Sequence, residues 1–136
     1  MLAYHPLASR NMSNKPKCII VTGRPGSGKT TLANQLARKL WMPIISRDAI
    51  KEGYVNTYGI KHNQLPPDSN AIASNLFFAI VNQHLTGKVS TVIEAAFQHK
   101  IWAARFSEIL SLSNPFIIVC SLARLYPLIV HLQWCR

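Results

Sequence analysis

Short apolar runs alternate with segments of helical periodicity along most of the chain. Residues 18–21 form a continuous apolar run that ends at Gly23, which is typical of a strand covered on both faces in a parallel sheet. In residues 29–40, leucines recur every four positions with alanines beside them, which predicts a helix with one apolar stripe. A second apolar run at 43–46 leads into residues 47–52, which have the composition of a first helical turn.

The middle of the chain predicts a long loop followed by a helix. Residues 53–67 contain two glycines, two tyrosines and a Pro-Pro pair, which favours a loop of the kind that contacts substrate. Asp68 or Ser69 can cap a helix that runs to Leu85, and Gly87 is placed to stop it. We expect this helix to be largely buried, with an apolar stripe made of Ile72, Leu76 and Ile80.

Two further strands complete the pattern. Residues 90–94 are β-branched and apolar up to Glu94, residues 99–112 have helical character, and a strand at 116–120 follows an Asn-Pro turn. Strict alternation of strand and helix predicts an α/β fold with a mostly parallel sheet and helices on both faces.

Composition limits the classes of protein. The chain has 136 residues, of which 49% are hydrophobic and 15% charged, so it is one compact domain rather than a disordered, collagen-like or repeat protein. We expect a flexible leader at 1–16, a core at 17–121 and an atypical apolar tail at 122–136, where the alternation fails. A membrane span in the apolar stretch near the end is disfavoured, because Arg124 at its centre would cost roughly 2.5–3.5 kcal/mol.

Charge and cysteine content add a class of partner and a compartment. The formal net charge of +10 favours phosphate-bearing partners such as nucleotides, nucleic acids or anionic lipid. The three cysteines form no CxxC or Cys/His pattern, and two of them lie in apolar runs, where a thiol behaves as a small hydrophobe. We therefore expect reduced cysteines and a cytoplasmic protein.

One motif carries specific chemistry. The phosphate-loop pattern G-x-x-x-x-G-K-[ST] is satisfied by Gly23, Arg24, Pro25, Gly26, Ser27, Gly28, Lys29 and Thr30, between the first strand and the first helix. Lys29 is expected to reach the β- and γ-phosphates, Thr30 to supply a hydroxyl to Mg²⁺, and Thr31 to contact the α-phosphate. Arg24 belongs to the loop, but its side chain is assigned no role of its own. The motif predicts a nucleoside triphosphate with its Mg²⁺ as ligands.

The chain has only five acidic residues, and two of them follow predicted strands. Glu94 is placed to hold a water on Mg²⁺, as a Walker B acid does, although a solvated loop acid would also fit the pattern. Asp48 could accept the proton of an attacking hydroxyl, although an ordinary N-cap is also an open interpretation. Arg47 and Lys51 flank Asp48 and are either a clamp for a phosphate group or a plain solvated face.

Aromatic residues are weaker candidates. Tyr54, Tyr58 and His62 could line an acceptor pocket, but aromatic residues in a long loop more often pack it down. Trp102 and Phe106 have the spacing of a helix core rather than of a platform that stacks bases.

Four segments resemble a known group of enzymes. TGRPGSGKTTLANQLARKL, PIISRDAIKEG, STVIEAAFQ and FIIVCS are similar to the small P-loop kinases of the zeta-toxin, polynucleotide-kinase and AAA-like ATP-binding group, over about residues 17–121. The resemblance implies a three-layer P-loop NTPase fold and phosphoryl transfer from ATP with Mg²⁺. It also implies Asp48 as the base, Lys51 where relatives often carry arginine, and Glu94 in the Walker B position.

The resemblance stops at the last predicted strand. Such kinases continue with an arginine-bearing lid, a fifth strand and an adenine-binding loop, and residues 122–136 do not resemble these parts. We therefore expect a C-terminally truncated chain that lacks the lid and last strand, and an exposed sheet edge that favours a homo-oligomer.

Three functions remain open from the sequence. The first is a phosphotransferase that moves the γ-phosphate of Mg-ATP to a small-molecule or polynucleotide hydroxyl. The second is a nucleotide-binding module without turnover, since lid arginines contribute strongly to the rate. The third is a nucleic-acid binder or 5′-hydroxyl kinase, in keeping with the basic charge.

Overall fold

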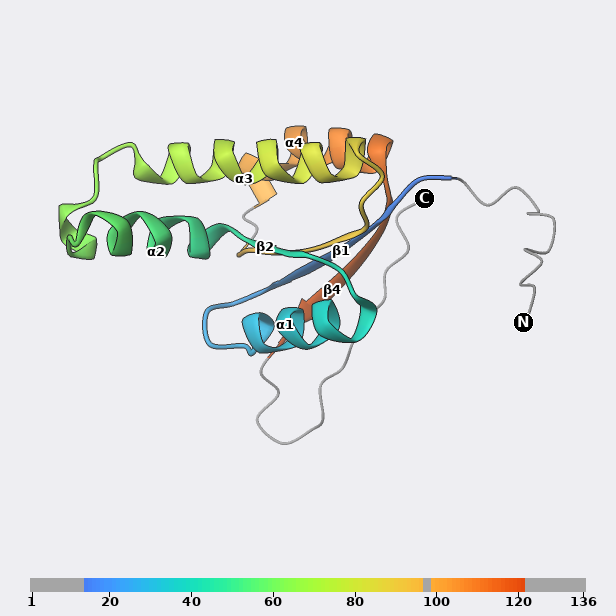
Figure 1. The fold of residues 1–136 in the computed structure, drawn as a ribbon, viewed down its shortest axis with the longest axis horizontal. Coiled ribbons are helices and arrows are strands. Elements are labelled where there is room, and N and C mark those ends of the chain that lie inside the picture. The colour runs from blue at the N-terminus through green and yellow to red at the C-terminus, as the bar shows by residue number, and fades with distance from the viewer. Residues whose placement is uncertain (1–13, 97–98, 122–136) are drawn as a thin grey trace, which may run out of the picture.

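The computed structural model describes residues 14–96 and 99–121, and Figure 1 shows strands and helices in alternation. The elements, in chain order, are β1 (Lys17–Gly23), α1 (Lys29–Leu40), β2 (Ile44–Ser46), α2 (Arg47–Tyr58), the short 3₁₀ helix η1 (His62–Gln64), α3 (Ser69–Thr86), β3 (Thr91–Glu94), α4 (His99–Leu112) and β4 (Asn114–Cys120). The four described strands form one parallel sheet in the order β2-β3-β1-β4. The predicted α/β fold with a parallel sheet is confirmed.

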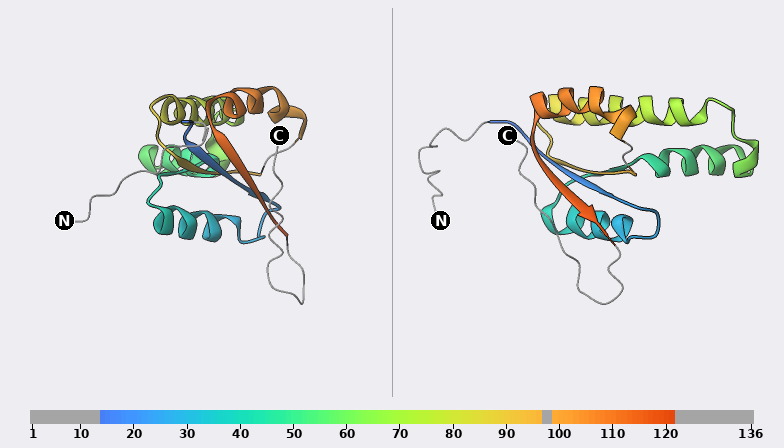
Figure 2. Two further views of the ribbon diagram at one scale, coloured as in Figure 1. Left: turned by 90° about the vertical axis from the view of Figure 1, so that its right-hand side faces the viewer. Right: turned by 180° about the vertical axis from the view of Figure 1, so that it is seen from behind.

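Helices cover both faces of the sheet (Figure 2). The side chains of β1 alternate between the two faces and pack against the helices on each. Cys18 and Ile20 pack with α3 and α4 on one face, whereas Ile19 and Val21 pack against α1 on the other. This is why the sequence of β1 is a continuous apolar run rather than an alternating one. Trp102 is buried among α3 and α4, and Phe106 packs against that cluster, so both belong to the core as expected.

The strand order brings three carboxyl ends together. Val21 of β1 pairs with Glu94 of β3, and Glu94 pairs in turn with Ser46 of β2. The phosphate-loop segment follows β1 and α2 follows β2 at this same end of the sheet, as Figure 1 shows. Residues from three separated segments can therefore contribute to one site there.

The prediction of a long loop at 53–67 is wrong for the first half of this segment. Helix α2 continues to Tyr58 and ends where Gly59 adopts a left-handed conformation, with φ of 61°. Val55 is buried and Ile50 packs on the core. Packing against α3 thus supplies the stabilisation that overrides the loop-like composition of this segment.

The predicted burial of α3 is also partly wrong. Ile72 and Leu76 are 53% and 47% exposed, whereas the buried residues are Ala73, Phe77, Phe78, Val81 and Leu85. The sequence is apolar on more than one side of the helix, so two stripes fit the helical period equally well. The stripe through Phe77 faces the sheet, and its neighbour faces α2 instead.

Strand β4 begins at Asn114, two residues earlier than expected, so the predicted Asn-Pro turn is part of the strand. Pro115 is tolerated there because β4 is an edge strand of the described sheet. Self-association through this edge stays a prediction. Residues 1–13 of the predicted leader, and the predicted tail at 122–136, lie outside the described residues. Within the described residues, no helix has both the length and the apolarity needed to cross a bilayer.

The two stripes of α3 can be distinguished by mutation. Phe77→Ala removes a fully buried ring from the centre of the core, and we expect it to lower the free energy of unfolding by about 3–5 kcal/mol. Leu76→Ala, one position earlier and half exposed, should cost less than about 1.5 kcal/mol. Urea denaturation of both variants checks this, and equal losses would contradict the assignment of the buried face.

Candidate active site

The phosphate-loop segment has the backbone that its glycines allow. A Cβ at Gly23 would lie 2.5 Å from the carbonyl oxygen of Cys120, so only glycine permits this close approach of β1 to β4. Gly26 and Gly28 have φ angles of 74° and 83°, in the left-handed region, and face open space. The Ser27 amide donates to the Arg24 carbonyl at 3.1 Å and closes the turn. The glycines therefore set the path of the backbone between β1 and α1 and leave open space beside Gly26 and Gly28.

Helix α1 begins directly after this loop. Gly28 is its N-cap and offers no side chain to cap it, and the first turn contains no acidic residue. The first amides of a helix have no acceptor within the helix, and the helix dipole is positive at this end. An anion placed here would be stabilised by both effects.

Glu94 is the centre of the site. Its side chain is buried, with the residue 1% exposed, at the end of β3. One carboxylate oxygen, Oε2, accepts a hydrogen bond of 2.7 Å from the Ser46 hydroxyl. The other, Oε1, accepts one of 3.4 Å from the Thr30 hydroxyl and lies 3.9 Å from Lys29 Nζ. A buried carboxylate held in this way is not a solvated loop acid, so that alternative is wrong.

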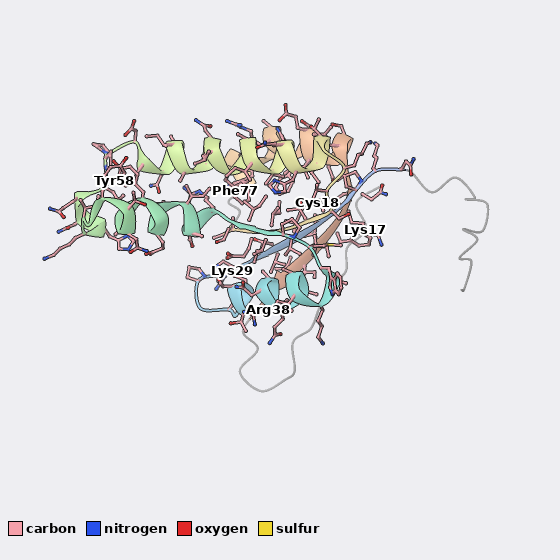
Figure 3. All side chains as sticks on the ribbon, viewed as in Figure 1. Lys17, Cys18, Lys29, Arg38, Tyr58 and Phe77 are labelled. Carbon is pink, nitrogen blue, oxygen red and sulfur yellow. The ribbon has the colours of Figure 1, made fainter. Side chains whose placement is uncertain are left out.

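Lys29 is the cation of this cluster. It is buried at the start of α1, and Figure 3 shows it beside the loop that joins β1 to α1. Burial of an ammonium group is costly unless it is paired, and the carboxylate of Glu94 provides the opposite charge.

Two loop hydroxyls fit a polyanion and its metal. The Ser27 hydroxyl oxygen is buried and has no hydrogen-bond partner among the described residues, so it is an unused donor within the loop. The Thr30 hydroxyl and Glu94 supply oxygen ligands of the kind that Mg²⁺ prefers. The residues present therefore fit a phosphate chain together with Mg²⁺. Arg24, Pro25 and Thr31 are exposed.

Asp48 lies on α2, two residues after Ser46 in the sequence. It is the second residue of the helix, since Ser46 is the N-cap, so the N-cap interpretation of Asp48 is wrong. Its side chain is 71% exposed, and the Arg47 guanidinium lies 4.0 Å from its carboxylate. An exposed carboxylate at the carboxyl end of a parallel sheet is free to meet a substrate hydroxyl.

The two basic neighbours of Asp48 are fixed by α3 rather than solvated freely. Arg47 Nε donates to the Ser74 hydroxyl at 2.9 Å, and Arg47 Nη2 donates to the Asn70 carbonyl at 3.1 Å. Lys51 Nζ donates to Asn70 Oδ1 at 2.7 Å. Asn70 thus holds both cations in place.

Ser46 and Asn70 are the site residues that the sequence interpretation missed. Ser46 ends the second strand, so its position beside the phosphate loop could have marked it, whereas nothing in the sequence pattern singles out Asn70. Of the aromatic candidates, the rings of Tyr54 and Tyr58 lie 4.6 Å apart on α2. His62 instead pairs with Glu52, at 3.0 Å.

Comparison with protein families decides the classification. Residues 18–124 match the AAA domain family AAA_33. The chain belongs to this family. It is 30% identical to a candidate kinase from Chloroflexus aurantiacus, with a TM-score of 0.70 over 78% of this chain and 59% of that one. The chain therefore spans less than two thirds of the length of that protein.

Two more distant structures share the fold. A chain of the Pnkp1/Rnl/Hen1 RNA repair complex is 20% identical, with a TM-score of 0.66 over 84% of this chain and 36% of that one. The APS kinase of Mycobacterium tuberculosis is 17% identical, with a TM-score of 0.58 over 78% of this chain and 76% of that one. The AAA-family chain thus has the fold of P-loop kinases, as the resemblance of its sequence implied.

The two described cysteines are buried thiols. Burial raises the pKa of the Cys18 thiol to about 12. Burial also raises the pKa of the Cys120 thiol beside Gly23, the charge of Lys29 opposes this shift, and that of Glu94 adds to it. Both groups are therefore protonated near neutral pH and are poor nucleophiles.

The raised pKa of Cys18 predicts a pH-dependent stability. The unfolded thiol loses its proton above pH 9.0 whereas the folded thiol keeps it to about 12, so the unfolded state binds fewer protons and stability falls as the pH rises through this window. Between about pH 9.5 and 10.5, the unfolding free energy of the wild type should fall by about 1 kcal/mol relative to that of Cys18→Ala. Urea denaturation at several pH values tests this, and parallel pH profiles would contradict it.

Proposed function

We propose that this protein is a phosphotransferase that moves the γ-phosphate of Mg-ATP to a hydroxyl group. The observation that carries the proposal is the buried carboxylate of Glu94, which contacts Lys29 and Thr30 at the end of the phosphate loop and Ser46 at the end of β2. Nucleotide binding explains this cluster better than stabilisation of the fold does, because a buried ion pair alone contributes little to the free energy of folding.

The phosphate chain would be held by the loop and by α1. The backbone amides of the loop and of the first turn of α1 provide donors, and the Ser27 hydroxyl is one more. Lys29 would neutralise charge on the β- and γ-phosphates. Neither Arg24 nor Pro25 takes part through its side chain in this arrangement.

Thr30 and Glu94 would hold Mg²⁺. When bound, the ion would neutralise the negative charge that develops on the transferring phosphoryl group. Ser46 acts on the metal site indirectly, since its 2.7 Å hydrogen bond fixes the orientation of the Glu94 carboxylate.

Asp48 would act as the general base. It takes the proton of the acceptor hydroxyl as the new bond forms between that oxygen and the γ-phosphorus, while the bond from phosphorus to the β–γ bridging oxygen breaks and ADP leaves. Arg47 and Lys51, both bound to Asn70, would stabilise negative charge on the transferring group.

Nucleotide binding can be tested through Lys29. A fluorescent ATP analogue with Mg²⁺ should bind the wild type, and Lys29→Ala should weaken binding about 10- to 100-fold, because a charge-assisted contact is lost. Lys39→Ala removes an exposed charge from the last turn of the same helix and is the matched control. A folded wild type that does not bind the analogue would sink the proposal.

The role of Asp48 can be tested separately from binding. In a γ-phosphate transfer assay with a panel of alcohols, sugars and 5′-hydroxyl oligonucleotides, Asp48→Asn should lower turnover by about 10²–10⁴ while affinity for the ATP analogue stays unchanged. Equal turnover in both proteins would remove Asp48 from the mechanism. Nucleotide binding without any product would favour the alternative of a binding module without turnover.

A further inference from the structure

A pocket of about 290 Å³ lies between α2 and α3. The two helices run side by side in opposite directions and extend beyond the sheet, and Figure 3 labels Tyr58 near their far end. Most of the lining is apolar or aromatic: Ile50, Tyr54 and Tyr58 from α2, Leu65 from the connection, and Ile72 and Leu76 from α3. The exposed apolar surface of α3 described above therefore faces a cavity that could hold a small ligand.

The lining has few groups that could satisfy a polar ligand. Lys51, Thr57 and Ser69 are the lining residues with polar side chains other than the two tyrosines, and Lys51 is the only charged one. A sugar buried here would leave several hydroxyls without partners, at a cost of about 1–3 kcal/mol each. A polynucleotide end would need several cations for its phosphates, and the pocket offers one. An aromatic or alicyclic body fits this lining better.

The pocket begins close to the proposed base. Lys51 and Ile50 line it and lie within one helical turn of Asp48, a rise of roughly 4.5 Å or less along the axis. Lys51 is held toward α3 by Asn70 at 2.7 Å, so its position at this end of the pocket is fixed. The end of the pocket at Ile50 and Lys51 is therefore the end nearest to Asp48 along α2, and a ligand that extends from it toward β2 would approach that carboxylate.

We propose that this pocket holds the body of the phosphoryl acceptor, and that the acceptor is a small alcohol with an aromatic or alicyclic body. This inference rests on the proposed phosphotransferase function. The alcohol oxygen bonds to the γ-phosphorus of ATP, ADP leaves with the bridging oxygen, and the hydroxyl proton passes to Asp48. The products are a phosphate monoester and ADP.

Gly53 allows the pocket to be filled without disturbing the core. It lines the pocket from within α2, and a Cβ added there meets no atom within 4 Å. Gly53→Leu should therefore fold, since leucine is also the better helix former. Asn56→Leu is the matched control, because Asn56 is exposed on the same helix and does not line the pocket.

The experiment measures binding of benzyl alcohol, cyclohexylmethanol, glucose and a 5′-hydroxyl oligonucleotide to the full chain by saturation-transfer NMR. We expect the two apolar alcohols to bind, Gly53→Leu to weaken their binding about tenfold or more, and Asn56→Leu to leave it unchanged. The proposal is overturned if the folded wild type binds neither alcohol, if it binds glucose or the oligonucleotide in preference, or if Gly53→Leu binds as the wild type does.

Two further measurements separate this inference from the proposed function. Binding of the fluorescent ATP analogue should be the same in Gly53→Leu and the wild type, because the pocket lies outside the phosphate loop. If the wild type itself does not bind the ATP analogue, the proposed phosphotransferase function fails. An alcohol that binds in the pocket of an ATP-binding protein, but never receives phosphate, would refute the role of the pocket as the acceptor site.

Discussion

The burial of one carboxylate is the constraint on which the site depends. Glu94 is surrounded by the sheet, so its charge needs partners within hydrogen-bonding or ion-pairing reach. They come from β2 through Ser46 and from α1 through Lys29 and Thr30. The order β2-β3-β1 is what allows this, since it places β3 between the two strands that lead to these residues. A different strand order would leave the carboxylate buried without them.

The same constraint fixes where α2 starts. Ser46 is both a partner of Glu94 and the N-cap of α2, so the first turn of α2 is tied to the end of β3. Arg47 then anchors that turn to α3 through Ser74 and Asn70. The position of Asp48 thus follows from contacts of its two preceding neighbours rather than from its own, because its side chain is largely exposed. This leaves its carboxylate accessible to a substrate.

The parts predicted correctly from the sequence are those that short-range patterns determine. The run at 18–21, the leucine spacing of α1 and the glycines of the phosphate loop each require one local structure. The extent of α2 could not be predicted in this way, because its glycine and tyrosines are typical of loops and its stability comes from packing on α3. The role of Asn70 could not be predicted either, since its contacts join residues 19 and 23 positions apart. Ser46 could be noted as the end of a predicted strand, but its contact with Glu94 could be predicted only with the order of the strands, because it joins β2 to β3.

The errors in the predicted burial of α3 and in the predicted loop have one cause. Ile72 and Leu76 were expected in the core, and Tyr54 and Tyr58 in a loop, yet all four face each other across the pocket between α2 and α3. Leaving apolar area in water costs about 25 cal/mol per Å², so an open apolar pocket reduces stability unless something binds there. Residues that break the simple pattern of a stable fold are expected where a protein binds a ligand. The pocket between α2 and α3, whose residues the sequence pattern assigned wrongly, is therefore the part of the structure where ligand binding should be tested first.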